Sequence, residues 1–170
     1  GELARYVGKK YGASAYRSSE VLRDILKRMH LPETRENVQK VSMMIRKFFG
    51  EDIISKINLE DTQKSQKHIV AIDGLRRKED FKYFRKKFDF RVIYIESDIK
   101  KRFARIAKRA ENQGDRGKNF PEFKRDHKRE TETKIKELKR SADYVVENNG
   151  TLREFQTKID KIMEDIINNK

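Results

Sequence analysis

Short apolar runs without helical periodicity alternate along this chain with stretches that have the periodicity of amphipathic helices. The runs occupy residues 68–72, 91–95 and 144–146 and are rich in β-branched and aromatic residues, which favour buried strands. Strands separated by helical stretches of ten or more residues pair in parallel through crossover connections. The alternation therefore predicts an α/β fold, a three-layer αβα sandwich around a parallel sheet.

Helical periodicity argues against disorder, although 41% of the residues are charged. Apolar residues recur at steps of three and four over residues 38–48 and again over 152–166, and each such stripe needs a core to pack against. The same reading extends the helix with the 38–48 stripe over residues 34–49 and predicts further helices at 2–11 and 19–30, one or two helical turns near 53–57 and a loop at 60–67. It also predicts a short strand at 13–17, a helix carrying Phe81 and Phe84 with Phe88 near its end, a helix capped by Ser97, a basic helix restarting at 119–121, and a last helix opened by a Thr151–Glu154 capping box.

Length and composition indicate one soluble domain spanning residues 1–170. No stretch approaches the roughly 20 consecutive apolar residues that span a bilayer, and no signal-peptide pattern is present, so we expect a cytoplasmic protein with no membrane partner. The chain has no Cys and only 3 His, which excludes disulfides, a thiol nucleophile and a thiolate zinc site.

The chain carries 42 Lys and Arg against 28 Asp and Glu, a formal net charge of +14. Such an excess predicts a polyanionic partner. Nucleic acid, the phosphates of a nucleotide and an acidic protein surface all satisfy it, so the charge does not choose among them.

Ligands of open parallel sheets bind beyond the carboxyl ends of the strands. Three polar segments follow predicted strands here, at residues 18–19, 73–74 and 148–150. Asp73 directly follows an apolar strand, where a carboxylate can support Mg²⁺ in phosphoryl transfer. The alternative is a simple turn, because Asp-Gly is a common turn dipeptide.

Several arginines lie close to these segments, and guanidinium groups suit bidentate recognition of phosphate. Arg76 follows Asp73 closely, and Arg23 lies one turn into the helix after Ser19. Arg105 and Arg109 share one face of a helix at a spacing of four. The alternative is that these arginines belong to solvent-exposed helix faces, or lie close together by chance, because the chain is so basic.

Five segments, in this order, resemble the P-loop nucleoside and deoxynucleoside monophosphate kinases, and they are also similar to the dephospho-coenzyme A kinases. The segments are residues 16–23 (YRSSEVLR), 31–37 (LPETREN), 69–76 (IVAIDGLR), 102–109 (RFARIAKR) and 142–152 (ADYVVENNGTL). The resemblance covers nearly the whole chain. It implies a helical acceptor-binding region at residues 20–60 and a lid at 111–123.

The resemblance also implies roles for single residues. The acceptor monophosphate would be bound by Ser19, Arg23, Arg35 and Arg76. Asp73 would lie near Mg²⁺, while Arg105 and Arg109 would approach the transferring phosphate, with Arg116 of the lid as a further phosphate ligand. The donor base would lie near Asn149, Gly150 and Thr151.

The resemblance fails at the start of the chain. These kinases begin with a strand and a phosphate-binding loop of the form G-x-x-x-x-G-K-[ST] or its G-K-G variant, and residues 1–170 contain neither. Gly1 corresponds to the residue after the loop lysine, so we expect the chain to be truncated and inactive as it stands. Glu2 occupies the position where many relatives carry a hydroxyl residue.

The function implied for the parent protein is ATP-dependent phosphoryl transfer to a nucleoside or deoxynucleoside monophosphate, with ATP and Mg²⁺ as cofactors. One alternative is dephospho-coenzyme A kinase activity. Another, from a different class, is a non-catalytic nucleic-acid-binding protein on a kinase-like fold, which the charge favours. Against that second alternative, the aromatic residues fall on predicted core stripes and do not alternate with basic residues as a base-stacking surface would require.

Overall fold

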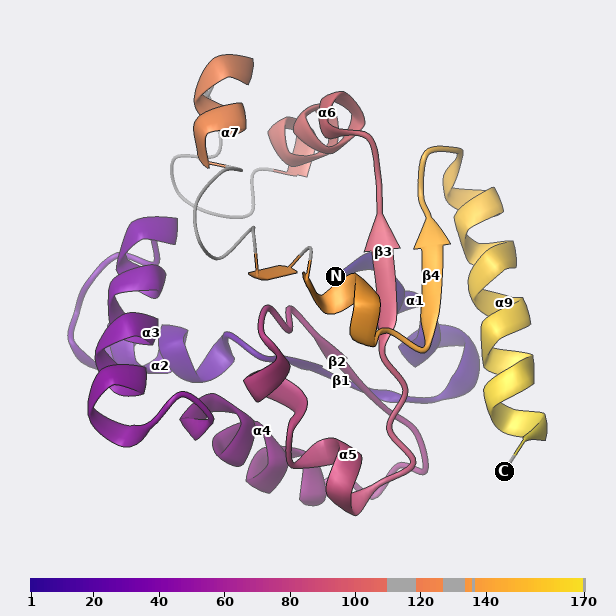
Figure 1. Cartoon of the computed structure of the whole chain (residues 1–170), viewed down its shortest axis with the longest axis horizontal. Helices are drawn as coiled ribbons and strands as arrows, with labels where there is room; N and C mark the ends of the chain where they lie inside the picture. The colour runs from indigo at the N-terminus through magenta and orange to yellow at the C-terminus, as the bar shows by residue number, and fades with distance from the viewer. Residues whose placement is uncertain (110–118, 127–133, 136, 170) are drawn as a thin grey trace.

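A computed structural model describes residues 1–109, 119–126, 134–135 and 137–169 of the chain. Four short strands alternate with helices, which confirms the predicted α/β class (Figure 1). The strands are β1 (Ser14–Arg17), β2 (Val70–Asp73), β3 (Ile93–Glu96) and β4 (Tyr144–Glu147). The α-helices are α1 (Glu2–Tyr11), α2 (Glu20–Arg28), α3 (Arg35–Phe49), α4 (Ile53–Gln63), α5 (Phe84–Lys87), α6 (Ile99–Arg109), α7 (Phe120–Asp126) and α9 (Leu152–Asn168), and two 3-10 helices are η1 (Lys78–Phe81) and η2 (Lys139–Ser141).

The strands form two parallel pairs. β1 pairs with β2 so that Arg17 lies opposite Asp73, and β3 pairs with β4 so that Glu96 lies opposite Glu147. Among the described residues, no backbone hydrogen bond joins β2 to β3. The predicted parallel sheet is therefore present as two halves, and the neighbouring edges of β2 and β3 are unpaired along their length.

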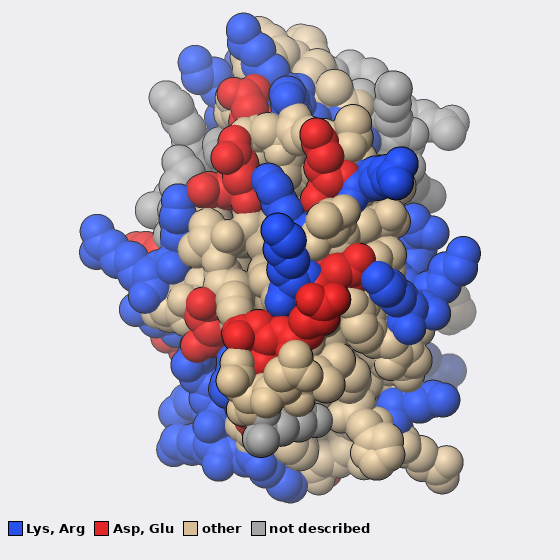
Figure 2. Space-filling model, turned by 90° about the vertical axis from the view of Figure 1, so that its right-hand side faces the viewer, with Lys and Arg blue, Asp and Glu red and all other residues tan. Residues whose placement is uncertain are grey.

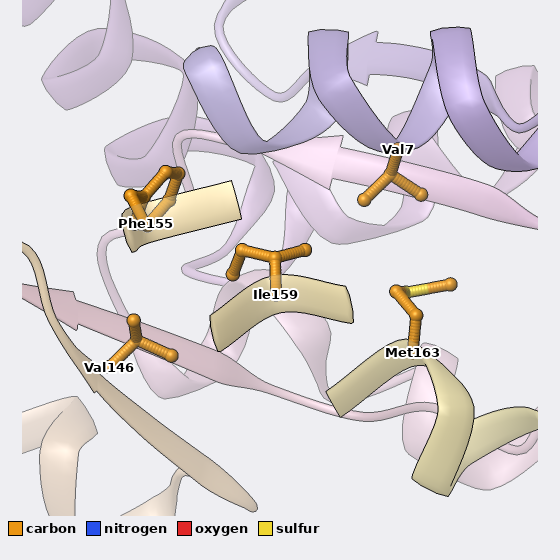
Figure 3. Close-up of a cluster of buried hydrophobic side chains, with 5 residues drawn as sticks. All are labelled: Val7, Val146, Phe155, Ile159 and Met163. Carbon is orange, nitrogen blue, oxygen red and sulfur yellow. The ribbon is translucent and has the colours of Figure 1, made fainter. Parts of the chain in front are cut away.

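Both halves contribute to the same two hydrophobic layers, so they act as one sheet in packing. On one side, Val7 of α1 meets Phe155, Ile159 and Met163 of α9 above Val146 of β4, and all five side chains are buried (Figure 3). On the other side lies a second cluster, built around the buried residues Phe81, Phe84 and Leu138. Ile72 of β2 and Tyr94 of β3 both pack against that second cluster, which gives the molecule its three layers.

A helical unit formed by α2, α3 and α4 has its own apolar cluster. α2 and α3 lie at one end of the β1–β2 pair, and α4 runs alongside the pair, where Leu59 packs against the second cluster (Figure 1). The core of the unit is made of Leu22, Leu26, Val41, Ile45 and Ile54. The unit has its own apolar centre, so it can present polar side chains toward the sheet without opening the main core.

The structure corrects three local expectations. α4 continues to Gln63, so residues 60–63 are helical and not part of a loop. The aromatic stretch that carries Phe81, Phe84 and Phe88 is not one helix, because it divides into η1 and α5. The cap of α6 is Asp98, whose Oδ1 accepts a hydrogen bond from the Lys100 N–H at 2.8 Å, and not Ser97.

Helix caps at three other places match the sequence. Thr34 accepts from the Asn37 N–H at 3.1 Å at the start of α3, and Gly50 follows its end. Thr151 and Glu154 form the expected capping box of α9. Asn119 and Glu122 exchange hydrogen bonds at the start of α7. Within the described residues, none of the helices is long and apolar enough to cross a membrane.

Candidate functional site

A cavity of about 970 Å³ separates β2 from β3. Its walls are the strand residues themselves, with Leu3, Ala4 and Val7 of α1 on one side. Charged side chains also line it, namely Arg35, Asp73, Arg76, Asp89, Arg91, Glu96, Arg102 and Lys139. Asp73 and Glu96 end β2 and β3, so two carboxylates stand on either side of the cavity at the carboxyl ends of the strands.

Asp73 lies where the first helix begins. Its Oδ2 accepts a hydrogen bond from the amino group of Gly1, and a Cβ atom on Gly1 would lie only 2.8 Å from the same oxygen. The backbone carbonyl of Asp73 accepts from the Ser18 N–H at 2.8 Å, which continues the β1–β2 pairing past the strands. The amino-terminal end of α1 and its positive dipole therefore point at the Asp73 carboxylate.

The loop after β2 turns at Gly74, whose φ of 84° is a left-handed conformation that favours glycine. The backbone N–H groups of Arg76 and Arg77 both donate to Oδ2 of Asp80, at 2.9 and 3.0 Å. The Arg77 side chain leaves the cavity and donates to Glu51 Oε2 at 2.6 Å. Arg76 is therefore the arginine of this pair that lines the cavity.

The helical unit positions the side chains that follow β1. Asn58 of α4 donates to the Ser18 hydroxyl at 3.0 Å, and both residues are buried. Ser19 is the residue before α2, but its side chain makes no capping hydrogen bond. Arg23 pairs with Glu33 at 2.9 Å and is largely buried, with 12% of its side chain exposed.

Arg105 binds the segment after β4. Its guanidinium donates to the carbonyl oxygens of Asn148 at 2.7 Å and Gly150 at 3.1 Å. Oδ1 of Asn149 accepts from the Asp98 N–H at 2.8 Å. These contacts join α6, and Asp98 before it, to the 148–150 segment. After that segment, hydrogen bonds from Thr151 lower the pKa of the Glu154 carboxyl.

Positive charge is concentrated on α6. This helix has six Lys or Arg in eleven residues and no acidic residue, and Arg109 is its last residue. In contrast, α9 carries four acidic and three basic residues, and Figure 2 shows acidic and basic side chains interspersed on the face that it presents. A polyanion would therefore meet the stronger field at α6. Arg116 and most of the expected lid lie outside the described residues.

The acidic groups at the cavity suit Mg²⁺ only in combination with a phosphate ligand. In the part of the chain that the structure describes, three metal-ligating side chains do not gather at any one point. Mg²⁺ is commonly held by one or two carboxylates together with phosphate oxygens and water. Asp73, which is paired with the Gly1 amino group, and Glu96, which is paired with Lys139 at 2.7 Å, could each supply one such carboxylate. The pairing with Glu96 raises the pKa of the Lys139 ammonium.

The cavity brings together three of the residues singled out from the sequence, Asp73, Arg35 and Arg76. Ser19, Arg23, Arg105, Asn149, Gly150 and Thr151 do not line it, although Ser19 and Arg23 belong to the adjoining α2 end of the helical unit. Sequence reasoning missed Asp80 and Lys139. Neither follows a predicted strand, and each has an ion-pair partner distant in the chain, Arg46 for Asp80 and Glu96 for Lys139. The local signal for Asp80 is its capping box with Arg77 at the start of η1.

Comparison with known proteins gives a family match over most of the chain. Residues 1–124 match the model of a family described as AAA domain. A UPF0200 protein of Pyrococcus horikoshii is 31% identical over 174 aligned positions, which cover 99% of this chain and 92% of that protein. A UPF0200 protein of Methanocaldococcus jannaschii is 30% identical, with 96% and 83% covered.

A solved structure has the same arrangement of elements. The dephospho-CoA kinase from Campylobacter jejuni superposes with a TM-score of 0.52 over 96% of this chain and 90% of its own. The sequence identity is 15%, so the likeness concerns the fold.

Proposed function

Because the chain belongs to the P-loop kinase-like AAA domain family and to the UPF0200 proteins, we propose that the protein transfers a phosphoryl group from ATP to a small monophosphate. A nucleoside or deoxynucleoside monophosphate is the first acceptor class. Dephospho-coenzyme A is the second, favoured by the fold shared with a dephospho-CoA kinase.

The observation that carries the proposal is the grouping of Arg35, Arg76 and Asp73 around one cavity. Two guanidinium groups from different elements can bind the oxygens of one phosphate in a bidentate manner. A carboxylate on the same wall would repel that phosphate unless a cation stood between them. This combination suits a site that holds an anionic acceptor next to a metal-bound donor.

The residues of this chain would act by position and charge. ATP with Mg²⁺ supplies the transferable phosphoryl group and neutralises part of its charge. Arg35 and Arg76 would hold the acceptor phosphate, and Arg23 of the neighbouring helix would join them. Asp73 would hold the metal, and the basic α6 would face the charge that spreads over the transferring group.

The test is a coupled binding and transfer assay. The full-length protein is incubated with ATP, Mg²⁺ and each of AMP, CMP, GMP, UMP, dTMP and dephospho-coenzyme A, and the phosphorylated product is identified by mass spectrometry. The proposal expects one acceptor to be phosphorylated well above the others. Hydrolysis of ATP without transfer to any member of the panel would overturn it.

A further inference from the structure

Arg46 and Asp80 form an ion pair inside the molecule. Their side chains are 4% and 3% exposed, and Arg46 Nη2 donates to Asp80 Oδ1. Arg46 also donates to the backbone carbonyl of Glu51. Removing two charges from water is costly, and a buried pair is often replaceable by apolar residues without loss of stability. Stability alone therefore does not explain why this pair is charged.

The second carboxylate oxygen of Asp80 explains why a charged residue occupies this position. Oδ2 accepts hydrogen bonds from the backbone N–H groups of Arg76 and Arg77, in the loop that follows β2. One carboxylate thus binds the end of α3 through Arg46 and the loop through two amides. An apolar side chain could fill the space, but it could not accept from either amide.

This connection decides which arginine reaches the cavity. Neighbouring residues in an extended segment point in opposite directions. With both amides held by Asp80, Arg77 points to Glu51 and Arg76 lines the cavity. Gly74, at the start of the loop, has a φ of 84°, a left-handed conformation that glycine adopts without strain.

The other end of α3 carries Arg35, the second arginine of the proposed acceptor site. Arg35 is the first residue of α3 and lines the same cavity, whereas Arg46 lies three turns further along, about 16 Å by helical rise. A rigid helix therefore extends from Arg35 to the Asp80 anchor, and the anchor fixes the loop that carries Arg76. We propose that Asp80, held by Arg46, is a positioning residue that sets Arg76 relative to Arg35 for the acceptor phosphate. This inference rests on the proposed function.

The test compares two carboxylates of similar bonding. Asp80→Asn is the variant, and Asp160→Asn is its matched control, because Asp160 of α9 accepts from Tyr6 and Tyr11 and pairs with Lys10, away from the cavity. The probe is whichever monophosphate of the panel binds the wild type most tightly. We expect Asp80→Asn to weaken its binding about tenfold or more, comparable with losing one charge-assisted hydrogen bond, and to change ATP affinity less than about twofold. We expect Asp160→Asn to lower the melting temperature and leave acceptor affinity unchanged.

Hydrogen exchange tests the same inference without a ligand. In the unliganded protein, Asp80→Asn should speed exchange of the Arg76 and Arg77 amides more than exchange in α9. Where Asp80→Asn does not fold, Arg46→Lys is used, since it keeps the charge but loses the guanidinium that also binds the Glu51 carbonyl.

The outcomes separate the two claims. Acceptor affinity and loop exchange equal to wild type in the Asp80 or Arg46 variant would overturn the positioning role while the proposed function stands. If the wild-type protein binds ATP but no monophosphate, the proposed function fails, and the positioning role fails with it. An acceptor defect of equal size in Asp160→Asn would show a general loss of structure and would also overturn the positioning role.

Discussion

Arg23 Nη1 lies 2.9 Å from Glu33 Oε2, so the arginine expected to bind the acceptor is held by a carboxylate in the turn between α2 and α3. The pair has two consequences. It orients the guanidinium in the absence of ligand, and it makes Glu33 a competitor for the phosphate that Arg23 would bind. Both consequences can be measured by removing one partner at a time.

We predict that Arg23→Ala weakens binding of the best monophosphate by about 10- to 100-fold, the loss expected for one hydrogen-bonded charge. Isothermal titration calorimetry measures the change. Arg28→Ala, at the exposed end of the same helix, is the matched control and should bind as the wild type does. Glu33→Gln removes the competitor and should not weaken binding. Equal affinity in Arg23→Ala and wild type would mean that Arg23 takes no part in the acceptor site.

The buried ion pair between Arg46 and Asp80 leads to a prediction about the free energy of unfolding. Arg46→Met leaves the Asp80 carboxylate buried without its cation, and we predict a loss of about 3–5 kcal/mol in the free energy of unfolding. Lys40→Met removes an exposed pair with Glu36 on the same helix and should cost less than about 1 kcal/mol. Urea denaturation followed by circular dichroism measures both. If the two variants lost equal stability, the burial of the Arg46–Asp80 pair would have no energetic consequence.

Low pH should remove the contribution of the hydrogen bond between Tyr83 and Asp52 to stability. Asp52 accepts from the Tyr83 hydroxyl at 2.7 Å, and this hydrogen bond, with Lys82 and Lys56 nearby, lowers the pKa of Asp52 from 3.8 to about 2. Because the folded pKa is the lower one, the contribution is present above about pH 4 and is lost as the pH falls toward 2. We predict that Tyr83→Phe lowers the melting temperature near pH 6 and that its difference from wild type shrinks by pH 2.

Thermal melts at pH 2 to 6 test this prediction. Tyr16→Phe is the control, since the Tyr16 hydroxyl has no hydrogen-bond partner in the part of the chain that the structure describes. Its melting temperature should differ from wild type by the same amount at every pH. A difference for Tyr83→Phe that stayed constant down to pH 2 would contradict the assignment.

Local patterns predicted the elements well where local physics decides. β2, β3 and β4 contain β-branched and apolar runs, whereas β1 (SAYR) does not, and the caps at Thr34 and Thr151 depend on residues three apart. The predicted end of α4 was wrong because polar residues in its second half are buried. Thr62 lies in the predicted loop at 60–67, yet it is buried and its hydroxyl donates to the carbonyl of Asn58, which itself binds Ser18.

Long-range contacts explain the other differences. The aromatic stretch after Arg77 is divided because Asp80 must face Arg46, while Phe81 and Phe84 both stack on Phe90. Of the three polar segments that follow predicted strands, only residues 73–74 line the cavity. Asp80 forms a local capping box with Arg77 at the start of η1, but no sequence pattern indicates its partner Arg46, which lies 34 residues away.

Salt dependence separates the kinase from the nucleic-acid-binding alternative. The six cationic residues of α6 could contact about six phosphates, and such a complex should lose about a thousandfold in affinity between 50 and 200 mM salt. We predict instead weak binding to single- and double-stranded oligonucleotides, measured by fluorescence anisotropy, and a much shallower salt dependence for the mononucleotide. Tight oligonucleotide binding with the steep slope, together with no response to any mononucleotide, would favour the alternative.

The unpaired edges of β2 and β3 lead to the last prediction. Ile72 and Tyr94 share one hydrophobic layer, and Ile69 and Ile93 share the other, so a strand placed in the cavity would meet apolar side chains on both faces and unpaired backbone groups on both edges. Such a strand would end beside Asp73, near the start of α1, where a loop of backbone N–H groups and a lysine could bind triphosphate.

We therefore predict that ATP with Mg²⁺ stabilises a chain extended upstream of Gly1 by a strand and a phosphate-binding loop, and hardly affects residues 1–170 alone. At 100 times the dissociation constant, one bound ligand adds about 2.7 kcal/mol, which corresponds to roughly 5–10 °C in melting temperature for a domain of this size. Differential scanning fluorimetry measures the shift, and ATP with excess chelator is the control. Replacing the loop lysine with Ala should remove most of the shift, because the triphosphate then loses its cation. An equal magnesium-dependent shift in residues 1–170 alone would place the nucleotide elsewhere on the molecule.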